Sequence, residues 1–296
     1  MRIKTNLALY GMLVPGIILT IVFHYLPMAG LVIAFQDYKP WLGFSRSPWV
    51  GLDHFRTAFT RPDALQVIWN TFIIACMKII VNLAVPVLFA LLLNEIRKVA
   101  FKRTVQTLVY LPHFLSWVIL GGIITDMLSS QGVINKLLMP LLGLQPYLFL
   151  ADGDWFRAIV VVTENWKEFG FSTIIFLAAL SNVDPSLYEA AEVDGANRWQ
   201  QTLTVTLPAI VPIIVVIGTL AMGSILNAGF DQIFNLYNPL VYEKGDIIDT
   251  FVYRVGLLSS QFGLATAVGL FKSGVGFVMI ALAYFLAKRL ANYRIF

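Results

Sequence analysis

Polar side chains inside apolar runs are the residues of this chain that could contact a polar solute. One apolar run, residues 156–180, contains ENWKE at positions 164–168. A charge at the centre of a bilayer costs about 2.5–3.5 kcal/mol on insertion scales, so it usually faces a partner or a water-filled cavity. A tryptophan here offers a flat face to a sugar ring, and its neighbours offer hydrogen bonds to hydroxyl or carboxylate groups. The residues predicted to line a solute pathway are Asn165, Trp166, Lys167 and Glu168.

A different interpretation of the same segment needs no solute. Glu164 and Lys167 are spaced i, i+3 on a helix, a spacing at which opposite charges can pair. Trp166 would then be a packing residue only.

A second polar interruption follows the run that ends near residue 225. Irregular backbone at membrane depth is tolerated where it lines a cavity, so we expect four residues here to belong to the pathway: Asn227, Phe230, Asp231 and Gln232. The alternative is that they belong to an ordinary outer loop. Acidic sugars would suit three lysines in apolar runs, which are Lys78, Lys167 and Lys272.

Motifs of enzymatic or nucleotide-binding chemistry are missing from the sequence. The segment Gly269-Leu270-Phe271-Lys272-Ser273 has neither the glycine spacing nor the Gly-Lys pair of a phosphate-binding loop, and no G-x-S-x-G or H-E-x-x-H occurs. The histidines His24, His54 and His113 share no metal-ligand spacing, and the single cysteine, Cys76, lies in an apolar run as a small packing residue. We therefore expect no catalytic residue, cofactor or metal on this chain, and nucleotide bound on another polypeptide.

The composition predicts an all-α membrane protein. The chain has 296 residues, of which 58% are hydrophobic and 13% charged, against roughly 25% charged in soluble domains. About 20 apolar residues cross a bilayer as a helix. Six runs reach or approach that length, at 7–35, 67–93, 104–125, 156–180, 207–225 and 264–287.

Basic residues predict the orientation of these six spans. They cluster beside apolar runs near the N-terminus, in the loop around residues 97–103 and near the C-terminus, which six spans place on one side. The positive-inside bias makes that side the cytoplasm, so both termini are predicted there. The same clustering accounts for the net charge of +4 and excludes nucleic acid as a partner.

The predicted divisions are residues 1–66 (first span and periplasmic segment), 67–287 (core, with a polar loop at 184–206) and 288–296 (cytoplasmic tail).

The polar stretch from 184 to 208 lies between the fourth and fifth spans, on the predicted cytoplasmic side. Asp184 can act as an N-cap, and Pro185 occupies the first helical position, where its missing N–H costs nothing. Gly195 is the expected stop, because glycine tolerates a left-handed backbone. We therefore predict two short helices around a glycine.

This stretch carries a recognisable motif. Glu189-Ala190-Ala191, Gly195, Val205, Leu207 and Pro208 follow the pattern E-A-A, three residues, Gly, nine residues, I-x-L-P, with valine in place of isoleucine. The pattern resembles the signature of permease subunits of binding-protein-dependent ABC importers. The resemblance implies a type I ABC importer permease fold and a coupling helix that docks on a cytoplasmic ATPase. It assigns the docking to Tyr188, Glu189, Ala190, Ala191, Asp194, Gly195 and Ala196, and the motif end to Leu207 and Pro208. Without it, the stretch would be an ordinary capped loop.

Nearly the whole chain resembles the carbohydrate-uptake branch of that family, including LplB-like and MalF-like permeases and those for alginate or other polysaccharides. The similar pieces are FQDY at 35–38, SPWVGL at 47–52, NWK at 165–167 and the run 227–238. The resemblance implies a multi-pass protein of the bacterial inner membrane, forming half of an oligosaccharide or polysaccharide pathway. The implied partners are a second permease, two ATP-binding subunits that carry ATP and Mg, an extracytoplasmic solute-binding protein and lipid.

Two other classes of function remain as alternatives. A secondary transporter or channel would work without an ATPase and would need a relay, for which only Lys78, Glu164 and Glu168 could serve. No internal repeat of the kind such transporters often carry is visible. A membrane enzyme would turn over substrate without a partner.

Overall fold

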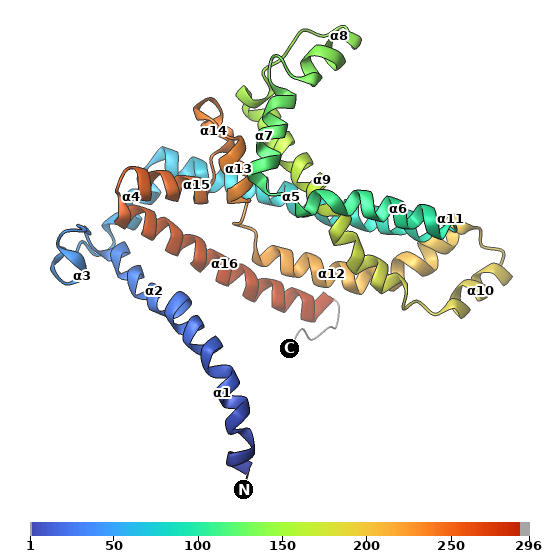
Figure 1. Cartoon of the computed structure of the whole chain (residues 1–296), viewed down its shortest axis with the longest axis horizontal. Coiled ribbons are helices and arrows are strands. Elements are labelled where there is room, and N and C mark those ends of the chain that lie inside the picture. Colours follow the sequence, from blue (N-terminus) through green and yellow to red (C-terminus); the bar gives the residue numbers. More distant parts are fainter. Residues whose placement is uncertain (1, 291–296) are drawn as a thin grey trace. The chain divides into compact units, whose positions relative to one another are not determined.

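The computed structural model describes residues 2–290, which form helices and their connections (Figure 1). In that part of the chain the one isolated strand-like bridge joins Gln36 and Trp49. The chain divides into two compact units, Met1–Pro62 with Phe251–Phe271, and Asp63–Thr250 with Lys272–Phe296. The end of the first segment lies close to the boundary predicted at residue 66, whereas the grouping of Phe251–Phe271 with it has no counterpart in the predicted divisions.

The first unit begins with a long apolar helical run. It consists of α1 (Arg2–Thr20), a π segment (Ile21–Tyr25), α2 (Leu26–Met28) and a 3-10 segment (Ala29–Phe35). The part from Tyr10 to Phe35 is long and apolar enough to cross a membrane, which confirms the first predicted span.

The rest of the first unit is made of shorter elements and one end of a long helix. These are α3 (Gly43–Arg46), α4 (Asp53–Thr60), a π segment (Tyr253–Leu258) and the first part of α16 (Phe262–Leu290). An aromatic contact between Phe59 of α4 and Phe271 of α16, with ring centroids 5.0 Å apart, holds two of them together.

The second unit contains the other long helices. They are α5 (Pro62–Asn94), α9 (Gly153–Leu180), α12 (Leu207–Gly223) and the remainder of α16. At 1.5 Å per residue the 33 residues of α5 extend about 50 Å, which is longer than the roughly 30 Å hydrocarbon core of a bilayer. The ends of this helix therefore reach beyond the apolar layer.

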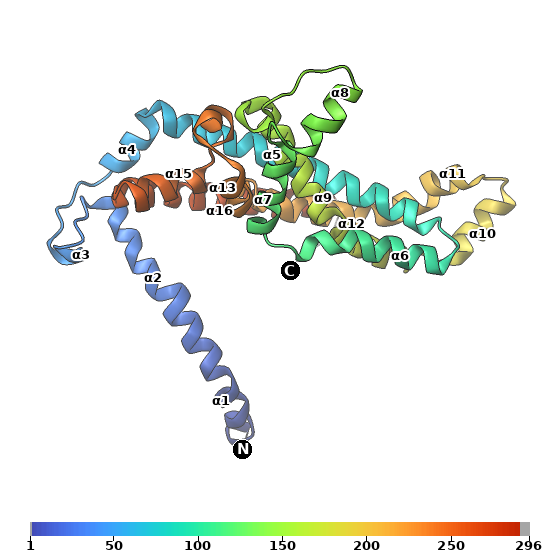
Figure 2. The same cartoon turned by 45° about the horizontal axis from the view of Figure 1, so that its top comes forward.

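The remaining elements of the second unit are short and irregular. They are α6 (Val99–Tyr110), η3 (Leu111–Phe114), α7 (Trp117–Leu128), η4 (Ile134–Leu138), α8 (Met139–Leu141), η5 (Phe149–Ala151), α10 (Pro185–Val193), α11 (Arg198–Gln201), η6 (Thr202–Thr206), α13 (Phe230–Leu236), η7 (Pro239–Val241) and α14 (Tyr242–Gly245). The short helix α15 (Ile248–Val252) contains the boundary between the two units, which follows Thr250. Figure 2 shows α6 lying beside α5 and α9, as in Figure 1, with α10 and α11 at the end of these helices.

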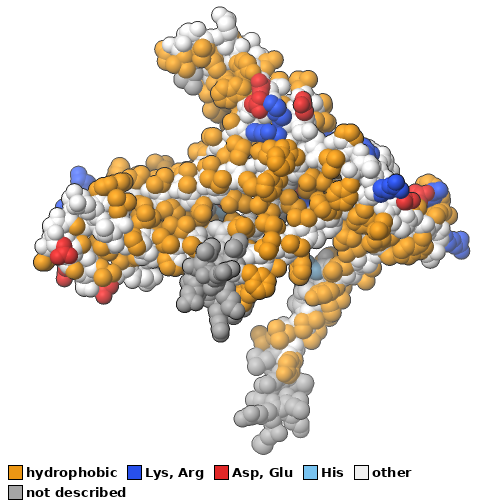
Figure 3. All heavy atoms as spheres, turned by 180° about the vertical axis from the view of Figure 1, so that it is seen from behind, with side chains coloured by type: hydrophobic (Ala, Val, Ile, Leu, Met, Phe, Trp, Pro, Cys, Tyr) orange, Lys and Arg blue, Asp and Glu red, His pale blue; other side chains and the backbone are white. Residues whose placement is uncertain are grey.

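Four helical runs of the described residues meet the length and composition of a membrane span: 10–35, 62–94, 198–223 and 262–285. Two bent helix pairs meet them together, 99–114 with 117–128 and 153–180 with 185–193, which gives up to six spans. Hydrophobic side chains cover most of the face in Figure 3, and charged side chains gather in a few small groups. This surface suits lipid.

The third span, predicted as the apolar run 104–125, is not one continuous helix. The chain bends by 100° between the helical segments that end at Phe114 and begin at Trp117. Pro112 lies in the 3-10 turn that precedes the bend, and Ser116 starts a new helix by accepting a hydrogen bond from the Ile119 N–H at 3.4 Å. A proline followed by a fresh N-cap is a sufficient physical cause of the break.

The buried apolar side chains of the second unit form two clusters. One joins α5, α7, α9 and α13 through Ile74, Leu120, Phe156 and Ile233. The other joins α5, α9 and α12 through Val87, Ala90, Phe176, Leu180 and Ile210. Between membrane helices such packing acts through van der Waals contact, since lipid tails are as apolar as leucine.

Candidate functional site

The polar stretch between α9 and α12 folds as one short helix, α10, before Gly195, as predicted. After Gly195 the predicted second short helix is wrong, because α11 is the first turn of a helical run that continues to Gly223. The Asp184 side chain caps α10 by accepting a hydrogen bond from the Ser186 N–H at 2.9 Å, and Pro185 occupies the first turn. The hydrogen bonds from Ser186 lower the pKa of the Asp184 carboxyl below its ordinary value, because they favour its charged form.

The end of α10 has the geometry of a Schellman motif. Gly195 adopts φ +79°, and its N–H donates to the Glu192 carbonyl at 3.0 Å. The Ala196 N–H donates to the Ala191 carbonyl at 2.9 Å. This pair of bonds needs a left-handed residue at the position of Gly195, which glycine supplies without strain. The glycine of the motif thus sets the direction in which the chain leaves the helix.

The second helix is anchored on both sides. Asn197 and Gln200 form a capping box, in which each side chain accepts from the other residue's backbone N–H. Arg198 pairs with Glu95, which follows the end of α5, at 3.3 Å. The Tyr188 hydroxyl lies 3.1 Å from the Thr206 hydroxyl, so the two helices are also tied to each other.

The residues predicted to dock on an ATPase lie together on this segment. Glu189, Ala190, Asp194 and Gly195 are exposed, while Tyr188, Ala191 and Ala196 are partly buried. The side chain of Val193 is 88% exposed, and those of Leu187 and Trp199 are exposed as well. Exposed apolar side chains on an otherwise polar segment are compatible with a surface that another protein covers.

The end of the motif belongs to a helix that starts earlier than predicted. The Leu207 N–H reaches the Thr202 carbonyl through a π turn, and Leu207 packs against the cluster that contains Phe176 and Leu180. Pro208 lies in the first turn of α12. The helical run is therefore continuous from Arg198 to Gly223, whereas the prediction began the fifth span at residue 207.

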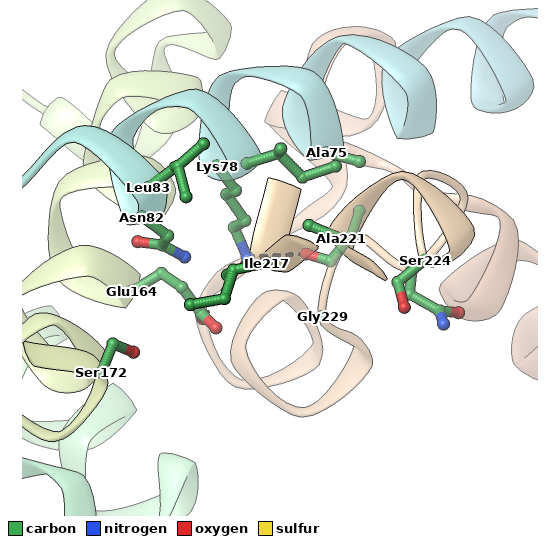
Figure 4. Close-up of a pocket in the computed structure, with 13 residues that line it drawn as sticks. Ala75, Lys78, Asn82, Leu83, Glu164, Ser172, Ile217, Ala221, Ser224 and Gly229 are labelled. Atoms are coloured by element: carbon green, nitrogen blue, oxygen red, sulfur yellow. Dashed lines mark hydrogen bonds and ion pairs between the residues drawn. The ribbon is translucent and has the colours of Figure 1, made fainter. Parts of the chain in front are cut away.

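A polar cavity of about 350 Å³ lies among α5, α9, α12 and the segment that precedes α13 (Figure 4). Its polar lining residues are Lys78, Asn82, Glu164, Ser172, Ser224 and Asn227. In Figure 4 the Lys78 and Glu164 side chains point toward one another from different helices. Hydrogen-bonding groups from several spans around one cavity suit a hydroxylated solute.

Lys78 is the centre of a buried network beside this cavity. Its ammonium donates to the Ala228 carbonyl at 2.6 Å and to the Gln232 side-chain oxygen, and it lies 3.5 Å from a Glu164 carboxylate oxygen. A Cβ at Gly229, where φ is +92°, would lie 3.0 Å from the ammonium nitrogen. Glycine is thus required there for both its backbone angle and the space beside the cation.

The four residues predicted after residue 226 differ in their surroundings. Asn227 lines the cavity. Gln232 is buried, and its amide donates to the Val160 carbonyl and the Thr163 hydroxyl, both at 2.8 Å. Phe230 stacks on Phe234 with centroids 5.2 Å apart, and Asp231 is exposed.

The residues of the ENWKE segment at 164–168 also differ in their surroundings. The Asn165 amide donates to the Asn82 side-chain oxygen at 3.0 Å. Lys167 donates to the His113 carbonyl at 2.7 Å and pairs with Glu168 at 2.9 Å, and Glu168 in turn lies 2.7 Å from His113 Nδ1. The Trp166 side chain is 46% exposed.

The alternative pairing of Glu164 with Lys167 is wrong. Glu164 pairs with Lys78 of α5, and Lys167 pairs with Glu168. A spacing of three positions allows two side chains of a helix to pair but does not require it, and here each of the two charges has another partner. Lys272 likewise pairs with Asp249 at 2.6 Å. Each of the three lysines suggested for acidic sugars is therefore already neutralised by a carboxylate.

Five polar cavity residues were missing from the predicted pathway. The charges of Lys78 and Glu164 had been noted within apolar runs, whereas Asn82, Ser172 and Ser224 had not been considered. Asn82 could have been found, because it is an amide inside an apolar run. The serines carry no such signal, since hydroxyls in spans commonly bond to their own helix. Among the described residues, no group of three or more His, Cys, Asp or Glu side chains could hold a metal ion.

Residues 82–292 match the family model described as binding-protein-dependent transport system inner membrane component. The chain belongs to this family. Protein LplB of Bacillus subtilis (strain 168) is 46% identical to this membrane component over 97% of its length and 90% of LplB. The polygalacturonan/rhamnogalacturonan transport system permease protein YteP of the same organism is 44% identical with the same coverage.

Chains of two solved ABC transporter structures are similar to this chain in both sequence and fold. The crystal structure of a bacterial ABC transporter that imports the acidic polysaccharide alginate includes a chain 40% identical to this membrane component, with a TM-score of 0.90 and 98% of each chain covered. A structure of a bacterial alginate ABC transporter in complex with an alginate pentasaccharide-bound periplasmic protein gives 39% identity and a TM-score of 0.91, covering 99% of this chain and 98% of the other. The predicted type I ABC importer permease fold is confirmed.

Proposed function

We propose that the chain forms half of the translocation pathway of an ATP-driven importer for oligosaccharides or polysaccharides. The observation that carries the proposal is the capped segment at 184–206, which presents Glu189, Ala190 and Gly195 at the end of two spans in a chain of the importer family. YteP is a polygalacturonan/rhamnogalacturonan transport system permease, and the similar transporter of known structure is involved in the import of alginate, which supports a saccharide substrate.

The assembly that this proposal requires contains several chains. A second, similar permease completes the pathway, two ATPase subunits bind ATP and Mg, and an extracytoplasmic solute-binding protein delivers the saccharide. Both termini and the segment with α10 lie in the cytoplasm of a bacterial inner-membrane protein, in agreement with the positive-inside bias. ATP binding closes the ATPases, and their contact with α10 biases the spans between two packings.

We further propose that the cavity beside Lys78 belongs to the pathway. Asn82, Asn227 and the Glu164 carboxylate offer hydrogen bonds to sugar hydroxyls. Trp166 offers an exposed ring, and Asp231 an exposed carboxylate, from the same unit. Asn165, Lys167, Glu168 and Gln232 then hold the wall of the pathway in place through their internal hydrogen bonds.

The docking proposal is tested in the complete transporter, reconstituted in liposomes together with its solute-binding protein. Uptake is measured with a radiolabelled oligosaccharide that the solute-binding protein binds. Glu189→Lys and Gly195→Leu should abolish ATP-driven uptake and co-purification of the ATPase, while membrane insertion persists. Asp53→Lys, a charge reversal at an exposed position at the start of α4, is the control and should leave both unchanged. Normal uptake by both docking variants would refute the proposal. Uptake by this chain alone, without ATP, would support the secondary-transporter alternative instead.

A further inference from the structure

A second polar cavity, of about 300 Å³, lies between α6 and α9 near the ends of these helices. Its residues from α6 are Lys102, Gln106 and Tyr110, which are spaced by four and therefore share one face of the helix. Its residues from α9 are Ile174, Leu177, Ala178 and Ser181, and Asn94 closes it from the end of α5. One wall is thus polar and the other is mainly apolar.

The ammonium of Lys102 is the only charged group that lines this cavity, and the described residues provide it with no hydrogen-bond or ion-pair partner. Lys102 is partly buried, whereas the neighbouring Arg103 is exposed. Arg97 and Lys98 lie in the linker just before α6, and the nearby carboxylate of Glu95 is already paired with Arg198. Four basic side chains therefore lie at the start of α6 and in the linker before it.

The position of the cavity favours a membrane component over a soluble anion. It lies where α5 and α9 end, at Asn94 and Leu180, so its polar part is at the depth of lipid headgroups. Ile174 is exposed and continues the apolar wall along α9 toward the bilayer interior. A ligand with a phosphate at one end and acyl chains at the other matches both parts.

We propose that the groove between α6 and α9 binds an anionic phospholipid, with its phosphate on Lys102. Asn94, Gln106 and Ser181 contribute neutral hydrogen-bonding groups around the headgroup, and an acyl chain lies over Ile174 and Leu177. Basic pockets between membrane helices are established sites for anionic headgroups. Asn94 of the pocket directly precedes Glu95, which pairs with Arg198 of α11.

Native mass spectrometry of the full-length protein in detergent, titrated with phosphatidylglycerol or with phosphatidylcholine of the same acyl chains, tests this site. The wild type should retain one phosphatidylglycerol in preference to phosphatidylcholine. Lys102→Gln should weaken that retention about tenfold, the effect of losing one charge-assisted contact. Arg103→Gln removes the same charge one position away, outside the cavity, and should weaken it less than about threefold.

A second variant keeps the test valid if Lys102→Gln folds poorly. Ala178→Phe adds a ring to the apolar wall without changing charge, and it should also displace the lipid. Equal effects of Lys102→Gln and Arg103→Gln would show general surface attraction and overturn the proposal. Displacement of the lipid by millimolar inorganic phosphate would also overturn it, since the site would then select a free anion. Unchanged retention in Ala178→Phe would place the lipid outside the groove and would contradict the proposal as well.

Discussion

Lys78 and Glu164 are separated by 86 positions in the sequence, and their charged groups lie 3.5 Å apart between α5 and α9. The same ammonium donates hydrogen bonds to the Ala228 carbonyl and to the Gln232 side-chain oxygen. One cation therefore joins two spans to the irregular segment that precedes α13, and it does so at the wall of the candidate solute cavity.

Removing this cation should destabilise the protein. Lys78→Met leaves a carboxylate at Glu164 without its cation and two oxygens without a donor, so we expect a loss of about 3–5 kcal/mol in the free energy of unfolding. The double variant Lys78→Met with Glu164→Gln should recover part of the loss. Denaturant unfolding in mixed micelles measures both. Lys98→Met, at an exposed position, is the control and should change stability by less than about 0.5 kcal/mol; equal stability of the two lysine variants would contradict a structural role for the network.

The left-handed backbone at Gly195 should be required for ATPase binding. No heavy atom lies within 4 Å of a Cβ built there, so Gly195→Ala costs only the backbone strain, about 1–2 kcal/mol. We expect the affinity for the ATPase subunit to fall about tenfold, and Gly195→Asn to have a smaller effect because asparagine tolerates this conformation. Binding to immobilised ATPase is the measurement. Gly122→Ala, a helical position with equally open surroundings, should bind normally.

The crossing of α6 and α9 depends on Gly170. A Cβ there would lie 2.2 Å from the Val109 carbonyl oxygen, so Gly170→Ala must push the two helices apart. Overpacking of this kind costs about 1–3 kcal/mol, and thermal unfolding in detergent should record it. Gly274→Ala in α16 meets no heavy atom within 4 Å and should be neutral or slightly stabilising, since alanine favours the helix. A thermal midpoint unchanged in Gly170→Ala would mean that the helices do not cross so closely.

The start of α10 should loosen in acid. The pKa of Asp184 is lowered in the folded protein by the hydrogen bonds from Ser186. The stabilisation by this cap is therefore complete above the unfolded-state pKa of about 3.9 and is lost as the pH falls through the lower folded-state value. Hydrogen exchange of the Ser186 amide, corrected for its intrinsic rate, should accelerate below that pH. Asp184→Asn caps without titrating and should show no such change; a similar acceleration in this variant would assign the effect to another group.

Local signals predicted the part of the segment at 184–206 that runs from Asp184 to Gly195 well. Asp184, Pro185 and Gly195 act on their own backbone or on neighbours within a few residues, so their types and order suffice to predict a cap, a first turn and a left-handed stop. The long apolar runs predicted the spans for a similar reason, because length and composition determine whether a helix can cross a bilayer.

The pairing of charges inside the spans could not be predicted in this way. Glu164 has Lys167 three positions away, and yet it pairs with Lys78, because the packing of α5 on α9 decides which side chains meet. The break of the third span was also missed, although Pro112 and Ser116 were visible signals. Hydropathy measures how long an apolar run is and not the direction of its backbone, so it does not reveal a bend within such a run.

The π turn at Thr202–Thr206 has a mechanical consequence. The helix continues through Pro208, so one helical run of 26 residues, about 39 Å long, extends from Arg198 to Gly223. On the other side of Gly195, α10 meets α9 at an angle of 73° across a short linker. We therefore expect a displacement of α10 to reach the fifth span through a continuous helix and the fourth span across a bend, so that the two spans would move by different amounts.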